Sequence, residues 1–108
     1  MKASFLILIL SAFPAIARID QERLADAIWV SEGGTNSVSP YGILRRGKLT
    51  QDEGRRLCLQ TIRHYYGYWH GTDRTFILHL ADKYCPPSCD PVGNRRWKRN
   101  VCAIYFRK

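Results

Sequence analysis

The chain has 108 residues, with 17 lysines and arginines against 9 aspartates and glutamates, so its formal net charge at pH 7 is +8. This length is enough for one domain and excludes a multidomain architecture. So basic a balance favours a polyanionic partner, such as a cell-wall polymer, an anionic lipid or a nucleic acid, without choosing among them.

The first 17 residues have the features of an export signal. Lys2 supplies the positive flank, residues 5–10 are apolar throughout, and Ala15 and Ala17 are the small side chains that a signal peptidase needs. The apolar run is shorter than the roughly 20 residues that cross a bilayer, which disfavours a membrane anchor. We therefore predict a signal peptide over residues 1–17, a mature domain over residues 18–108 with no membrane span, and a secreted or periplasmic location.

Four amphipathic patterns predict four helices and an all-α fold. The first helix runs from Asp20, which is placed as its N-cap, to about Glu32, and a Gly-Gly pair ends it. Its last turn, residues 28–30, is apolar on nearly all sides, so we expect that turn to be buried. Residues 33–50 are rich in glycine, serine and proline, which is typical of turns and leaves room for a short hairpin.

The other three helices follow the same periodic rule. The second begins at Thr50, where Glu53 three residues later completes a capping box. The third runs from about Asp73 to Tyr84, before two prolines, and the fourth has Asn94 as its cap. The residues expected to face the core are Cys58, Thr61, Ile62, Tyr65 and Trp69 in the second helix, Phe76, Ile77, Leu80 and Tyr84 in the third, and Trp97, Val101, Ile104 and Tyr105 in the fourth.

Four cysteines occur in this chain: Cys58, Cys85, Cys89 and Cys102. In an oxidising compartment an even set predicts two disulfides, and a small domain with a limited core is expected to need such staples. A zinc site is disfavoured, because the spacing is irregular and no histidine stands beside a cysteine in a ligand spacing. The sequence allows three pairings. Two prolines between Cys85 and Cys89 make that short bridge hard to form, so we favour Cys58–Cys85 with Cys89–Cys102.

Glu32 is the residue that points most directly to chemistry. It follows an apolar turn that contains Ile28 and Trp29, and it precedes two glycines. The partial negative charge at a helix C-terminus and the apolar walls both disfavour the carboxylate, so we expect the pKa of Glu32 to be raised. An acid that keeps its proton near neutral pH is what cleavage of a glycosidic bond requires. The glycines would let a sugar chain approach the backbone closely.

The segments Glu32-Gly33-Gly34 and Ser39-Pro40-Tyr41-Gly42-Ile43-Leu44 resemble the signature of the lysozyme-like superfamily, in its lytic transglycosylase and goose-type lysozyme branch. That signature is a helix ending in Glu-Ser or Glu-Gly, then a loop with serine and a small residue before glycine, then an apolar stretch. The resemblance covers residues 20–44, and the Gly-Leu-Met-Gln usual in the family is absent. It implies a small lysozyme-like domain in which Glu32 is the general acid and base, and Ser39, Tyr41 and Gly42 line the sugar cleft.

The resemblance also implies an enzyme that cleaves the glycan strand of peptidoglycan without a cofactor or a metal ion. Glycosidases with two carboxylates need a second acid about 5–10 Å from the first. The downstream candidates are Asp52, Glu53, Asp73 and Asp90, of which the first two look like helix-start acids. Lytic transglycosylases use a single glutamate, which protonates the leaving oxygen and then helps the sugar's own hydroxymethyl group to attack.

Two further features bear on function. We expect Tyr66 to be exposed at the end of the second helix, where its ring can stack on a sugar. Residues 94–100 are the densest basic run, with Arg95, Arg96 and Arg99 away from the apolar stripe. We interpret this run as a solvated face, or as one that attracts an anionic cell-wall polymer, rather than as a nucleic-acid reader. The alternative to a monomeric wall-cleaving enzyme is a non-catalytic cationic wall-binding or antimicrobial-type protein.

Overall fold

The computed structural model describes residues 19–34, 40–43 and 49–107. Within these ranges the chain forms four α-helices and one short 3-10 helix, and it contains no strand. The elements are α2 (Gln21–Ser31), η2 (Pro40–Gly42), α3 (Gln51–Tyr66), α4 (Asp73–Tyr84) and α5 (Pro91–Tyr105). The expected all-α class is confirmed. A hairpin is absent from the described part of residues 33–50, and the expected signal peptide lies outside the described residues.

The helices begin where side chains satisfy their first backbone N–H groups. The Asp20 side chain accepts a hydrogen bond from the Arg23 N–H and caps α2, as expected. At α3 the capping box is complete, because Thr50 Oγ1 accepts from the Glu53 N–H and Glu53 Oε1 accepts from the Thr50 N–H.

The start of α5 differs from the expectation. Asn94 was expected to cap this helix, but the cap is Asp90, whose carboxylate accepts from the Gly93 N–H at 2.9 Å. Pro91 then takes the first helical position, where its missing N–H and fixed φ fit a helix start. Asn94 therefore lies inside α5. It is buried there, and its amide nitrogen donates to Asp82 Oδ1 and to the Cys85 carbonyl.

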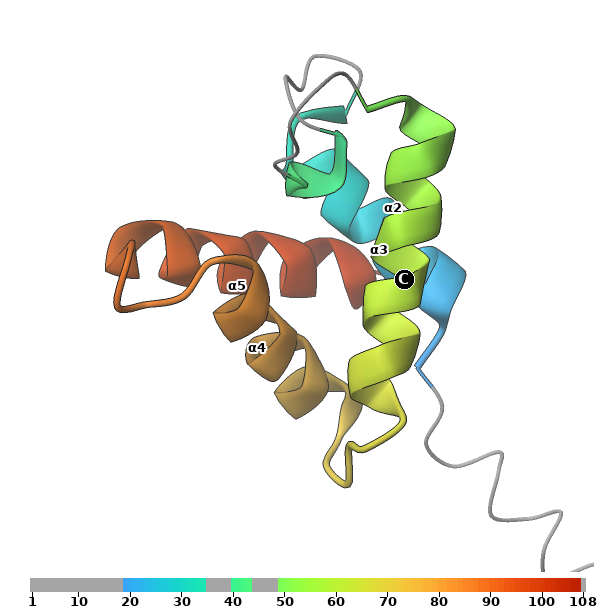
Figure 1. Ribbon diagram of the computed structural model, residues 1–108. Helices are drawn as coiled ribbons and strands as arrows, with labels where there is room; N and C mark the ends of the chain where they lie inside the picture. The colour runs from blue at the N-terminus through green and yellow to red at the C-terminus, as the bar shows by residue number, and fades with distance from the viewer. Residues whose placement is uncertain (1–18, 35–39, 44–48, 108) are drawn as a thin grey trace, which may run out of the picture.

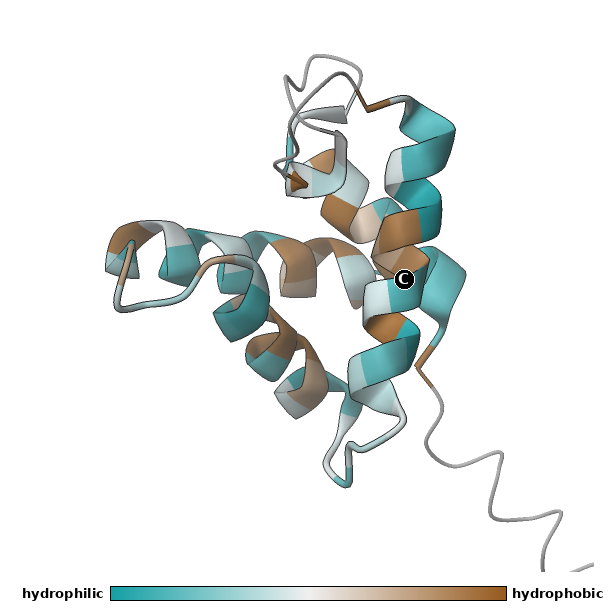
Figure 2. Ribbon diagram, viewed as in Figure 1, coloured by the Kyte–Doolittle hydropathy of each residue, from teal (hydrophilic) through white to brown (hydrophobic). Residues whose placement is uncertain are grey.

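The four helices pack around one apolar core. Helix α5 lies across the middle of the molecule and contacts both α2 and α4, while α3 packs against α2 and η2 (Figure 1). The apolar residues of the helices gather on their inward sides (Figure 2). The buried apolar side chains are Ile19, Leu24, Ala25, Ala27, Ile28, Tyr41, Cys58, Ile62, Phe76, Ile77, Leu80, Ala81, Trp97, Val101, Cys102 and Tyr105.

The last turn of α2 is only partly buried. Ile28 is fully buried as expected, whereas 53% of Val30 is exposed. Trp29 is half-buried and lies beside Gly34. The expectation that this turn is buried on all sides is therefore wrong, because α5 and α3 cover only part of its circumference.

Two tyrosine hydroxyls fix the start of α2. Tyr66 Oη accepts from the Ile19 N–H at 3.1 Å, and Tyr105 Oη accepts from the Asp20 N–H at 2.9 Å. Both contacts join residues far apart in the sequence and satisfy N–H groups that a helix start leaves without partners. The Tyr66 ring is half-buried against Phe76, with the ring centroids 4.9 Å apart. Tyr66 thus holds the start of α2 and packs against α4.

The four cysteines are free thiols, so the expected disulfides are not borne out. The Cys58 thiol is buried in the middle of α3, where it meets the Tyr84 phenol, while the Cys85 thiol faces the Asp90 carbonyl. Cys89 precedes α5, and Cys102 lies about 16 Å along that helix at 1.5 Å per residue. A disulfide needs Cα atoms within about 7 Å, so the second favoured pair is too far apart. The core and the caps hold this fold together instead.

No helix in the described ranges has both the length and the apolar character to cross a bilayer.

The buried Asn94 gives a test of this fold. We expect Asn94→Ala to lower the free energy of unfolding by about 1–3 kcal/mol, because it removes a buried amide and leaves the partly buried Cys85 carbonyl without this partner. Arg95→Ala, the exposed next residue on the same helix, is the control and should change stability by less than about 0.5 kcal/mol. Denaturant unfolding at pH 7 measures both. Equal effects from the two variants would contradict the structural role of Asn94.

Candidate functional site

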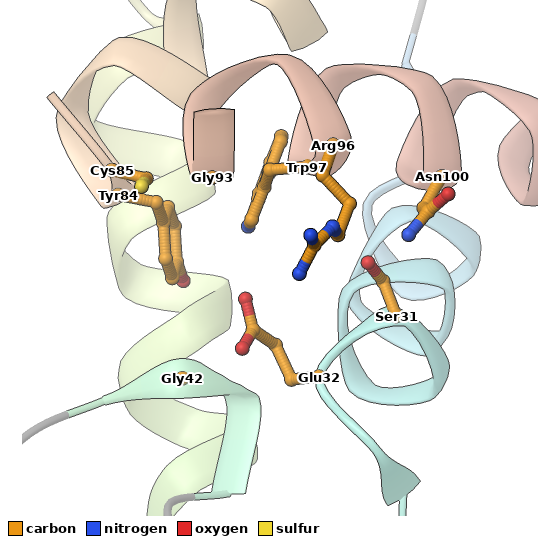
Figure 3. A pocket seen from close by; sticks show the side chains of 9 residues that line it. All are labelled: Ser31, Glu32, Gly42, Tyr84, Cys85, Gly93, Arg96, Trp97 and Asn100. Carbon is orange, nitrogen blue, oxygen red and sulfur yellow. The ribbon is translucent and has the colours of Figure 1, made fainter. Parts of the chain in front are cut away.

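A pocket of about 330 Å³ lies where the end of α2, η2, the end of α4 and the first two thirds of α5 meet. The pocket is formed by segments from four places in the chain, and its walls differ in chemistry. Aromatic rings form one side, the backbone of a glycine forms another, and polar side chains surround the opening. The residues that line it are Ser31, Glu32, Gly42, Tyr84, Cys85, Gly93, Arg96, Trp97 and Asn100 (Figure 3).

Glu32 projects into this pocket from the C-cap of α2. Its backbone N–H donates to the Ile28 carbonyl at 2.9 Å, which ends the helix and fixes the direction of the side chain. The carboxyl is half-buried, and burial raises its pKa. The Trp97 indole faces the carboxyl and offsets part of that increase. The expected raised pKa of Glu32 is therefore present, and loss of solvent is its largest cause.

Gly42 forms the wall beneath the carboxyl. A Cβ atom at Gly42 would lie 2.7 Å from Glu32 Cδ and 2.9 Å from each carboxyl oxygen, so no larger residue fits without a shift. The backbone at Gly42 has φ +67, a left-handed conformation that glycine adopts readily. The resemblance placed Gly42 at the site, and the structure brings it against Glu32.

Tyr84 and Trp97 form the aromatic wall. Their rings stack with centroids 5.4 Å apart and an interplanar angle of 28°. Both polar tips, the Tyr84 hydroxyl and the Trp97 indole N–H, point toward Glu32 (Figure 3). Both atoms are buried, and neither has a hydrogen-bond partner of ordinary geometry within the described residues. Burial and the nearby Cys58 thiol raise the pKa of Tyr84, and the Glu32 carboxylate adds to this effect, so the phenol keeps its proton.

The mouth of the pocket is polar. Arg96 extends from α5 toward the Glu32 carboxyl, and Ser31 and Asn100 face each other at the adjacent edge (Figure 3). Arg96 is exposed. A ligand in the pocket would therefore meet hydrogen-bond donors from several directions and a single carboxyl group.

The other residues expected at the site lie elsewhere or cannot be placed. Ser39 is outside the described residues. Tyr41 is 2% exposed, and its hydroxyl accepts from Arg55 Nη1 at 3.1 Å, so it supports the pocket from behind rather than lining it. Tyr66 is the last residue of α3, its hydroxyl binds the Ile19 N–H before α2, and it does not line the pocket.

Of the carboxylates considered as a second acid, Asp52 and Glu53 lie in the first turn of α3, Asp73 in that of α4, and Asp90 caps α5. Within the described ranges none of them lines the pocket. The same ranges contain no group of three or more His, Cys, Asp or Glu side chains that could hold a metal ion.

Sequence reasoning assigned no site role to Tyr84, Trp97, Arg96 or Asn100. Tyr84 and Trp97 were expected to face inward, which the structure bears out in part, since Tyr84 is half-buried and Trp97 is buried. The spacing within each helix shows which residues share a face, but it does not show that two such faces meet at the end of α2. That meeting follows from the way α5 crosses the molecule.

Comparisons of the chain with protein-family models, with curated proteins and with solved structures find no match. The resemblance to the lysozyme-like superfamily therefore stays a prediction from residues 20–44.

The raised pKa of Glu32 predicts a pH-dependent stability. Because the folded protein favours the protonated acid, this preference contributes fully to stability below about pH 4.5, the pKa of a solvated glutamate, and is lost as the pH rises through the raised value. Glu32→Gln carries no ionisable group there. We expect the variant to gain stability relative to the native protein as the pH increases from 4 to 8, measured by denaturant unfolding. A difference in unfolding free energy that stays constant over this range would contradict the burial of the acid.

Proposed function

We propose that this protein is a peptidoglycan-cleaving glycosidase of the lytic transglycosylase or lysozyme type, in which Glu32 is the general acid and base. The observation that supports this proposal best is the half-buried carboxyl at the inner wall of a pocket, with its pKa raised by burial. Such an acid holds its proton closer to neutral pH and can deliver it to a leaving glycosidic oxygen.

The composition of the pocket is consistent with a single-acid mechanism. With one carboxyl among the residues that line it, the site lacks the paired carboxylates of a two-acid glycosidase within the described ranges. In a lytic reaction the acid first protonates the leaving oxygen. The resulting carboxylate then takes the proton of the sugar's own hydroxymethyl group, which attacks the anomeric carbon and closes an anhydro ring. This scheme uses Glu32 twice and needs no second acid.

The remaining walls suit a sugar. The edges and faces of the Tyr84 and Trp97 rings offer an apolar surface for a pyranose. Their buried N–H and O–H groups would be satisfied by oxygens of a ligand, which removes the cost of leaving them without partners. Gly42 leaves space beside the carboxyl that any side chain would fill.

The test is Glu32→Gln, which keeps the shape of the side chain and removes the transferable proton. We expect the variant to clear a suspension of purified cell walls about 10²–10⁴-fold more slowly than the native protein, which is the usual contribution of a general acid. Sedimentation of the variant with the same walls should be unchanged. Turbidity records the first quantity, and the protein left in the supernatant records the second.

Asp52→Asn is the matched control, because it also turns a carboxyl group into an amide but does so at an exposed position in the first turn of α3. It should clear walls at the native rate. Clearing by Glu32→Gln at the native rate would rule out the proposed role of Glu32. Mass spectrometry of the released fragments then distinguishes anhydro-sugar products from hydrolysed ones.

A second candidate is a non-catalytic cationic protein that binds anionic wall polymers. The observation that favours it is the exposed face of α5, where Arg95, Arg96 and Arg99 lie on a helix that contains no acidic residue. This reading predicts binding to walls without clearing by the native protein, and binding that weakens as salt increases.

The double variant Arg95→Gln/Arg99→Gln tests the contribution of that face and leaves the pocket intact. We expect it to reduce the fraction of protein that sediments with walls at low salt, because two exposed positive charges are lost from α5. Arg56→Gln/Arg63→Gln removes the same charge from the exposed side of α3 and serves as the control. Equal losses from the two double variants would show that net charge, and not the α5 face, governs binding.

A further inference from the structure

Arg55 lies outside the pocket, on α3, but it joins this helix to α2 and η2, the two elements that bring Glu32 and Gly42 to the pocket. From α3, its Nη2 donates to Glu22 Oε2 at 2.5 Å, and its Nη1 donates both to Asp26 Oδ1 at 2.8 Å and to Tyr41 Oη at 3.1 Å. Two of these contacts reach α2, and the third reaches η2. The guanidinium is the more buried member of each ion pair, with 30% of the Arg55 side chain exposed against 63% for Glu22 and 67% for Asp26.

The Tyr41 contact acts on a strained residue. Tyr41 has φ +58 and ψ +21, a left-handed conformation that costs a residue other than glycine roughly 1–2 kcal/mol. Its ring is buried in the core, and its hydroxyl is held by Arg55. A conformation of this kind persists only where surrounding contacts enforce it. The core fixes the ring, and the guanidinium fixes its outer end.

Gly42 follows Tyr41 directly, so the position of one sets that of the other. The Cα of Gly42 lies against the Glu32 carboxyl, as the 2.7 Å clash of an added Cβ shows. A turn that moved away from α2 would uncover the carboxyl and admit water beside it. The contacts of Arg55 therefore bear on Glu32 through two intervening residues.

We propose that Arg55 is a positioning residue for Glu32, which holds the Pro40–Gly42 turn against the carboxyl through the Tyr41 hydroxyl. The consequence of this role for catalysis rests on the proposed function. The positioning of the turn by Arg55 does not. The fork of the guanidinium is essential to this role, because one nitrogen engages Tyr41 and Asp26 while the other engages Glu22. A lysine ammonium has the same charge but lacks two separate nitrogens in a fixed plane.

The effect is mechanical rather than a direct effect of charge on the acid. The titratable or charged groups that line the pocket with Glu32 are Tyr84 and Cys85 from α4 and Arg96 from α5. Gly42 is the pocket residue from η2 and brings no charge, and Arg55 does not line the pocket. Loss of the positive charge of Arg55 would by itself raise the pKa of Glu32 through space, so a fall in that pKa on removal of Arg55 must come through the turn.

The experiment follows the Glu32 carboxyl by ¹³C NMR across a pH titration in the native protein, in Arg55→Met and in Tyr41→Phe. The chain has three glutamates, at positions 22, 32 and 53, so comparison with Glu32→Gln assigns the signal. In both variants we expect the pKa of Glu32 to fall toward 4.5, the value of a solvated glutamate, and the backbone amide signal of Gly42 to move. Tyr41→Phe removes a single hydroxyl, so it keeps the test valid if Arg55→Met folds poorly.

Arg63→Met is the matched control. Arg63 is another arginine of α3 that bonds α2, since its Nε donates to Gln21 Oε1 at 2.9 Å, and this bond does not involve η2. We expect it to leave the pKa of Glu32 and the Gly42 signal at their native values. Arg55→Lys should behave like Arg55→Met if the fork is what matters.

Three results would overturn the proposal. They are an unchanged titration of Glu32 in folded Arg55→Met and Tyr41→Phe, an equal fall in Arg63→Met, or a native titration in Arg55→Lys. None of these measurements depends on enzyme activity. Altered titration in a protein that never clears walls would refute the proposed function and leave the positioning role intact. In a protein that does clear walls, Arg55→Met should lower the rate by about 10²-fold, as expected for a misplaced catalytic group.

Discussion

The Glu32 carboxyl is kept from bulk water by groups that come from four separate segments of the chain. The C-cap geometry of α2 directs the side chain inward, Gly42 closes one side, and the stacked rings of Tyr84 and Trp97 close another. Each contribution alone would leave the acid solvated. The raised pKa is therefore a property of the assembled fold, and any change that separates α5 or η2 from α2 removes it.

This arrangement costs stability at the site, and the rest of the fold offsets that cost. A half-buried acid, two buried polar groups without a hydrogen bond of ordinary geometry and a strained Tyr41 are all unfavourable. Around them the protein has a continuous apolar core, complete caps at α2 and α3, and the tie from the Tyr105 hydroxyl to the start of α2. Strain that is confined to one place and compensated elsewhere is typical of functional sites.

The features that were predictable from the sequence are those that depend on neighbours within a turn or two. The capping box at Thr50, the Asp20 cap and the bounds of α4 belong to this class, because each is decided by side chains three or four residues apart. The Asn94 cap was wrong because Asp90 with Pro91 offered a better start one turn earlier. The disulfides were wrong because an even cysteine count gives no distances, and α5 carries Cys102 far from Cys89.

For the candidate site, too, the sequence predicted the features that depend on near neighbours and missed those that depend on residues far along the chain. Glu32 could be singled out from the sequence, because its own helix end and the glycines beside it are local features. The expected walls, Ile28 and Trp29, were also local, and they are not the ones found. Ile28 is in the core and Trp29 packs beside Gly34, while Tyr84 and Trp97 come from helices more than fifty residues further along the chain.

Tyr41 is a residue that was expected at the site and lies outside the pocket lining. The resemblance to the lysozyme-like superfamily implied that Tyr41 lines the cleft, yet the structure turns its ring into the core and binds its hydroxyl to an arginine of α3. A left-handed backbone at a tyrosine is unfavourable by itself, so the turn depends on partners that no local rule could identify. In the positioning role that we propose, the exposure of the acid is set at a distance, by a guanidinium that does not line the pocket. The contacts of Arg55 that dock α3 on α2 are thus the same contacts that hold the turn beside Glu32.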